Sequence, residues 1–102
     1  MIKVIWSKES LLRLIEIEEF IAEDNPSKAV EFTDFLVSKS FLIEENPRMG
    51  RMVLEFSDPD IRELIIKGYR LVYRIRKSRI DILTVFEGHR LIRKSEIFID
   101  EE

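Results

Sequence analysis

The chain has 102 residues, 45% of them hydrophobic, and a formal net charge of −3, which together predict a single domain over residues 1–102 with its own core. Cysteine is absent, which excludes disulfides, cysteine–zinc sites and thiol nucleophiles, and no apolar run approaches the roughly 18 residues of a membrane span. The first residues lack an apolar segment with a small-residue cleavage site, so we expect no signal peptide and a cytoplasmic location.

The N-terminal half predicts a short strand and two helices. The β-branched and aromatic run at residues 2–6 predicts an edge strand. After it, Ser7 can cap a helix over residues 8–23, where apolar residues recur at helical spacing.

A second helix should follow a short break. Asn25 is a candidate N-cap, and Pro26 suits the first helical position because its missing N–H costs nothing there. This helix should run to about Glu45 and end before Pro47. Because the connection is short, we expect the two helices to form an antiparallel hairpin.

After Gly50 the pattern changes from helical to extended. Residues 51–60 predict a loop or irregular strand, since Asp-Pro-Asp is turn chemistry. Short connections then favour an antiparallel meander. The fold class is therefore α+β, with an N-terminal edge strand and a helix hairpin packed on one face of a C-terminal antiparallel sheet. The predicted strands are 61–67, 69–76, 80–87 and 91–99.

Arginines gather on one face of the predicted strand 69–76. Strand alternation places Tyr69, Leu71, Tyr73 and Ile75 on one face, and Arg70, Val72, Arg74 and Arg76 on the other. If the helices cover the first face, the second is left uncovered and basic, which suits a phosphate backbone or an acidic protein. The alternative is that the arginines pair across strands with Glu63, Asp81 or Glu87.

The charge of the chain is also divided along its length. Residues 1–47 contain 5 Lys or Arg against 10 Asp or Glu, residues 48–94 contain 12 against 6, and residues 95–102 contain none against 4. A basic middle segment with a net charge of +6 thus lies between acidic segments of −5 and −4. Electrostatic fields act locally, so this segment can attract an anionic partner although the whole chain is acidic.

Several stretches together resemble a known family. "NPRMGR", "IRELIIKGYRLVYRI" and "IDILTVFEGHR" are similar to the RelE/ParE superfamily of toxins from bacterial type II toxin–antitoxin pairs, and "IAEDNPSKAVEF" is typical of its ParE-like branch. The resemblance implies an α+β toxin of the plasmid-stabilisation type that a cognate antitoxin neutralises. In the ParE branch the associated target is DNA gyrase, whereas the RelE branch cleaves mRNA on the ribosome.

The resemblance to the nuclease branch is incomplete. Arg70 matches its strand arginine and Arg90 its second arginine, but Arg62 stands where lysines are expected, and Phe98 replaces the C-terminal tyrosine. His89, the single histidine, could restore an acid or base because its pKa is near neutral. Glu63 is better placed as a salt-bridge partner than as a base. No paired metal ligands and no Gly-rich phosphate-binding loops are present in the sequence, so we expect no cofactor.

Three functions remain open at this stage. The leading one is a non-enzymatic toxin acting on DNA gyrase; the others are a ribosome-dependent mRNA endoribonuclease and a degenerate toxin kept for antitoxin binding. Only the nuclease gives Arg70, Arg90 and His89 catalytic roles. The candidate residues for binding a partner are Arg62, Arg70, Arg74, Arg76 and Arg90.

Overall fold

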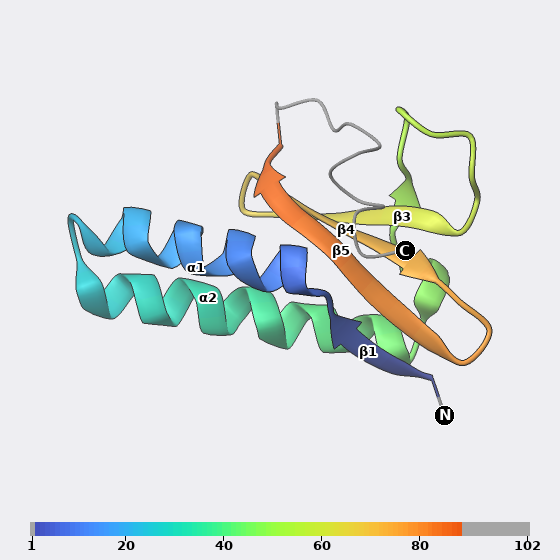
Figure 1. Cartoon of the computed structure of the whole chain (residues 1–102), viewed down its shortest axis with the longest axis horizontal. Coiled ribbons are helices and arrows are strands. Elements are labelled where there is room, and N and C mark those ends of the chain that lie inside the picture. The colour runs from blue at the N-terminus through green and yellow to red at the C-terminus, as the bar shows by residue number, and fades with distance from the viewer. Residues whose placement is uncertain (1, 89–102) are drawn as a thin grey trace.

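The computed structural model describes residues 2–88, in which a helix hairpin packs against a five-stranded mixed sheet (Figure 1). The predicted strand 91–99 and the candidate residues His89, Arg90 and Phe98 lie outside these described residues. None of the helices within residues 2–88 is long and apolar enough to cross a membrane.

The helix hairpin begins as the sequence predicts. Helix α1 spans Lys8–Ala22, and the Ser7 hydroxyl accepts a hydrogen bond from the Ser10 amide at 3.1 Å. Helix α2 spans Pro26–Ser40, and the Asn25 side chain accepts from the Lys28 amide at 3.1 Å. Both caps satisfy amide groups that a helix leaves unpaired in its first turn. Two 3₁₀ turns, η1 (Phe41–Glu44) and η2 (Pro47–Met49), continue from α2 toward the sheet.

The strands lie in the order β1-β5-β4-β3-β2. The edge strand β1 (Lys3–Trp6) pairs in parallel with β5 (Arg79–Glu87), and the remaining pairs are antiparallel. The other three strands are β2 (Arg51–Met52), β3 (Ile61–Ile66) and β4 (Tyr69–Ile75). The β3–β4 turn uses Lys67 and Gly68, both at positive φ (49° and 85°), the conformation that two-residue hairpins require.

The sheet face toward the helices carries the larger core. A β-bulge in the β4–β5 ladder, between Val72 and Tyr73, keeps Ile82 and Val85 on this same face although they are three residues apart. Two residues of the helical segment, Leu36 and Ile43, pack against it and are fully buried. In Figure 1 the two helices lie side by side and extend beyond the end of the sheet. The buried members of this helix-side core are Val4, Leu36, Ile43, Ile66, Leu71, Tyr73, Ile80, Ile82 and Val85.

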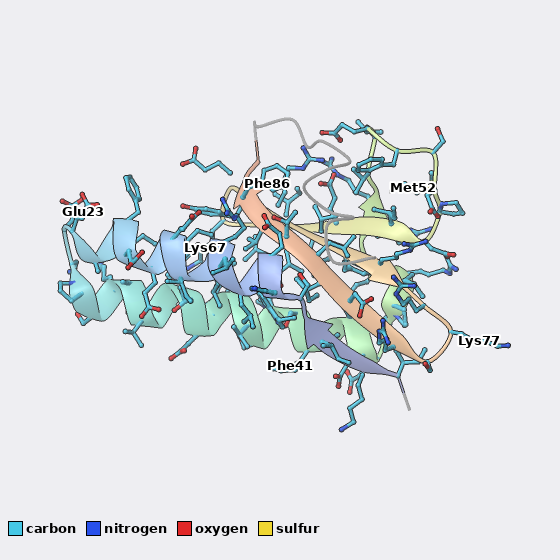
Figure 2. The ribbon with its side chains drawn as sticks, viewed as in Figure 1. Glu23, Phe41, Met52, Lys67, Lys77 and Phe86 are labelled. Carbon is cyan, nitrogen blue, oxygen red and sulfur yellow. The ribbon has the colours of Figure 1, made fainter. Side chains whose placement is uncertain are left out.

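The opposite face is also covered, by the loop of residues 53–60. Val53 and Phe56 from this loop pack on sheet residues, among them Phe86 near the end of β5, which Figure 2 labels. The buried members of this loop-side core are Val53, Phe56, Ile61, Val72, Leu83 and Phe86. The prediction of an uncovered second face is therefore wrong. Strand alternation correctly predicts which residues lie on the face opposite the helices. It gives no information on the loop that covers this face.

Candidate functional site

Arg70 lies at the centre of a buried ion-pair network on the loop side of the sheet. Its Nη1 and Nη2 donate to the two carboxylate oxygens of Glu55 at 2.9 and 2.8 Å. Its Nε donates to Glu63, whose other oxygen accepts from Arg51 Nε at 2.9 Å. We call these four residues, Arg51, Glu55, Glu63 and Arg70, the Arg70 cluster; it holds two positive and two negative charges.

Three strands and one loop position the Arg70 cluster. Glu63 on β3 and Arg70 on β4 are buried, with 2% and 5% of their surfaces exposed. Glu55 comes from the loop that covers this face, and Arg51 is an exposed residue of β2. The Arg70 guanidinium also lies 5.1 Å from the Phe86 ring centroid, a cation–π distance. A small cavity of about 280 Å³ adjoins the cluster and is lined by its four members and Leu54.

The electrostatics of the cluster hold Arg70 in its charged form. The pKa of Arg70 is raised above its ordinary value chiefly by its hydrogen bond to Glu55, and then by Glu63, while burial acts in the opposite direction. A guanidinium taken out of water needs such partners, because an unpaired buried charge costs several kcal/mol. The bidentate carboxylate of Glu55 occupies the donors that would otherwise hold a phosphate.

Arg70 therefore corrects one expectation from the sequence. We expected it on an uncovered basic face, but it is paired with two carboxylates and is buried. The alternative of pairing with Glu63 holds instead, and the expected role of Glu63 as a salt-bridge partner is confirmed. Glu55 is not among the residues predicted from the sequence, where its only signal is an acidic residue in an otherwise apolar stretch of loop.

The other candidate arginines lie at the margins of the sheet. Arg62 donates to the carbonyl oxygens of Pro59 and Gly50, both at 2.9 Å. Arg76 contacts Asp81 at 2.6 Å, as the cross-strand alternative predicted. Arg74 is half-buried on the loop side. A partner-binding role for Arg62, Arg74 and Arg76 stays a prediction.

Tyr73 is the most deeply buried polar side chain near these residues. Its hydroxyl donates to the Pro47 carbonyl at 2.6 Å and accepts from the Gly50 amide at 2.9 Å. Burial raises the pKa of Tyr73, so the phenol stays neutral and protonated. It thus fixes the turn before β2 and is not placed to take a proton from a substrate. The core position expected for Tyr73 is confirmed.

Within residues 2–88, no group of three or more acidic, histidine or cysteine side chains is arranged to hold a metal ion. His89 and Arg90, which the nuclease alternative needs, lie outside these residues, so their roles stay predictions. What the described part offers is a satisfied ion-pair cluster and exposed apolar side chains along the helices.

Comparison with known proteins identifies the family. The model of the "ParE toxin of type II toxin-antitoxin system, parDE" matches residues 4–92. A solved structure, the "Chromosomal ParDE TA system from P. aeruginosa", aligns with a TM-score of 0.72 at 18% sequence identity, over 85% of this chain and 96% of that chain. A search of curated proteins finds no match. The resemblance and the α+β fold predicted from the sequence are both confirmed.

Proposed function

The chain belongs to the ParE toxin family of type II toxin–antitoxin systems, and we propose that it poisons DNA gyrase in the cytoplasm and is neutralised by a cognate antitoxin. In this proposal the toxin acts by binding and needs no catalytic residue or cofactor. The partners are the antitoxin and gyrase.

The state of Arg70 carries the proposal. RNA cleavage through the 2′-hydroxyl needs free cations to stabilise the charge that develops on the phosphorus oxygens. Arg70 is the residue that best matches a nuclease arginine, yet its donors are taken by Glu55 and Glu63. A phosphate would have to displace two carboxylates from a buried site. The net charge of −3 adds little to this, because the basic segment of residues 48–94 acts locally on an anionic partner.

Exposed apolar side chains support the antitoxin part of the proposal. On α1, Leu11, Leu12, Ile15 and Phe20 are all exposed, with Phe20 reaching 65%. Several exposed apolar side chains along one helix are what a surface covered by a partner would present. These residues belong to the apolar repeat over residues 8–23, but Leu14 and Ile17 are the α1 residues that pack on the helix-side core. The exposed set is thus left for a partner.

The proposal is tested by two assays on one preparation of the protein: supercoiling by purified gyrase, and mRNA cleavage on purified ribosomes. We expect loss of supercoiling or trapped double-strand breaks, with intact mRNA. Cleaved mRNA with active gyrase would establish the nuclease alternative. A protein that affects neither assay and does not arrest growth would establish the degenerate alternative.

The variant His89→Ala separates the first two cases further. A gyrase poison should keep nearly all its toxicity after this change, because no proton transfer is involved. A nuclease should lose mRNA cleavage while still binding the antitoxin.

Co-purification with the protein encoded in the same operon tests the antitoxin itself, and failure of the two to associate would contradict this part of the proposal.

A further inference from the structure

One side of helix α1 is left exposed by the described residues. The helix contacts α2 and β5, and its Leu14 and Ile17 pack on the helix-side core. On the other side, Leu11, Leu12 and Ile15 are 45%, 44% and 51% exposed. Removing such apolar side chains from water is favourable, so a surface that covers them would be stabilised.

The exposed side of α1 has the residue spacing of a helix–helix contact. Four of its exposed residues follow one another at steps of four, three and four positions along the helix. Alternating steps of this kind place side chains on one line, and two helices pack along such lines with knobs in holes. We call these residues the α1 stripe; they are Lys8, Leu12, Ile15 and Glu19.

The order of charges makes the α1 stripe complementary to itself in one orientation. If a second copy packs antiparallel about a two-fold axis between Leu12 and Ile15, each Leu12 faces the Ile15 of the other copy. The same axis places each Lys8 opposite the Glu19 of the other copy, so both ends of the contact pair opposite charges. A parallel arrangement would instead bring lysine against lysine and glutamate against glutamate. The charges therefore favour the antiparallel arrangement.

The residues beside the stripe limit the strength of this contact. On one flank, Arg13 pairs with Glu9 and Glu16 at 3.2 and 2.9 Å, which partly compensates these two acids within each copy. Leu11 on the other flank adds apolar surface. A contact through one helix of 15 residues is small beside the roughly 1,200–2,000 Å² that a stable interface buries. A dimer formed in this way should be weak and should depend on protein concentration.

We propose that two copies of this chain pair antiparallel through the α1 stripe, so that the free protein forms a weak dimer. Leu12 and Ile15 of both copies meet at the two-fold axis, and each Lys8 pairs with the Glu19 of the other copy. The proposed function leaves the exposed apolar side chains of α1 to an antitoxin. In the absence of an antitoxin, the dimer covers this surface except for Phe20, which helical geometry places on another side of α1.

Reversal of charge tests the ends of the contact. The dissociation constant is measured by sedimentation equilibrium of the full chain at low ionic strength, from micromolar to submillimolar concentration. Glu19→Lys turns two attractive contacts into repulsive ones and should weaken the dimer about three- to ten-fold, as should Lys8→Glu. The double variant with both changes should restore it. Glu31→Lys makes the same change in net charge at an exposed position of α2 and should have little effect.

Three outcomes of this experiment would overturn the proposal. The first is an unaltered protein that stays monomeric at every concentration. The second is a double variant that dimerises as weakly as the single ones, since the charges would then not face each other. The third is an equal loss of dimer in Glu31→Lys, which would mean that net charge and not the α1 stripe controls association.

The variant Ile15→Asp tests the apolar centre. It should weaken the dimer roughly ten-fold or more, because it places two carboxylates in a contact that excludes water. Val30→Asp is the matched control, since Val30 is 49% exposed on α2 and Ile15 is 51% exposed on α1. Both positions are exposed in the single copy, so both variants should fold, which circular dichroism checks. Unchanged dimerisation of Ile15→Asp would contradict the contact.

Cross-linking tests the orientation of the two copies. The chain has no cysteine, so introduced thiols report on this contact alone. In an equimolar mixture, Leu12→Cys and Ile15→Cys should form the mixed disulfide faster than either forms a disulfide with itself. Faster self-linking would indicate parallel helices and overturn the proposal. All these measurements use the protein alone, so their failure leaves the gyrase and antitoxin proposals standing, and failure of those proposals leaves the dimer standing.

Discussion

The two faces of the sheet are closed by different physical means. On the helix side, apolar residues from two helices and four strands bury one another. On the loop side, a smaller apolar group is completed by the Arg70 cluster, in which a loop carboxylate neutralises a strand guanidinium. An arginine on a strand thus does not indicate an open surface when acidic residues lie within reach of it. The faces should respond differently to substitution.

The largest effect should come from Arg70→Ala. It leaves Glu63, whose side chain is 1% exposed, as a buried charge that keeps only its contact to exposed Arg51. Removing one partner of a buried pair costs about 3–5 kcal/mol in the free energy of unfolding. Urea denaturation measures the loss. The double variant Arg70→Met with Glu63→Leu should recover much of it, and a double variant as unstable as the single one would contradict a charge-based account.

On the helix side, Leu36→Ala should cost about 2–5 kcal/mol, because it leaves a cavity in a fully packed core. This loss should be insensitive to salt, since no charge is involved, which distinguishes the two faces in denaturation at low and high ionic strength. Val30→Ala, at an exposed position of the same helix, is the matched control and should have little effect. A comparable loss for both variants would argue against the packing described for α2.

Tyr73→Phe should have an intermediate effect. It removes the hydroxyl that joins Pro47 and Gly50 and leaves a buried amide without a partner. The expected loss is about 1–3 kcal/mol, measured by the same denaturation. Gly50 amide exchange with deuterium should accelerate in parallel. Unchanged exchange would mean that the turn does not depend on this hydroxyl.

Alkaline pH should destabilise the protein through the same residue. The pKa of Tyr73 is raised by burial and that of Tyr69 by burial and by Glu87, so both stay protonated in the folded state after the unfolded chain has ionised. Their contribution to stability is complete below the unfolded pKa of about 10 and is lost as pH rises through the folded values. The free energy of unfolding should fall above pH ~10, and less steeply in Tyr73→Phe.

The smallest effect should come from Arg48→Ala. Arg48 and Asp60 form an ion pair at 2.9 Å in which both side chains are about half exposed. Exposed pairs contribute about 0–1 kcal/mol. Thermal denaturation of Arg48→Ala and Arg70→Ala side by side would therefore compare the loss of an exposed arginine with the loss of a buried one. Similar shifts for both would contradict the distinction between the Arg70 cluster and the surface.

The sequence predicted the helices and strands better than it predicted the environment of individual side chains. The caps at Ser7 and Asn25 and the change from helix to strand after Gly50 depend on local chemistry, and both are found in the structure. The strands predicted within residues 2–88 are found to within about one residue at each end, whereas α2 ends at Ser40 and not near Glu45. The environment of Arg70 depends on Glu55, which is distant in the chain and lies in a loop without periodicity. The exposure of Leu11 and Phe20 likewise depends on where the sheet ends. The apolar repeat within α1 does not show how far the sheet extends.

The parallel pairing of β1 with β5 has a consequence for the order in which the chain can fold during synthesis. Val4 finds its strand partner at Ile80, so β1 is synthesised well before the strand with which it pairs. The helix hairpin is complete long before, and its apolar face stays uncovered through that interval. Contacts of such sequence separation slow folding. We expect a nascent chain to complete its sheet only after β5 has been synthesised, when a partner already present can meet it.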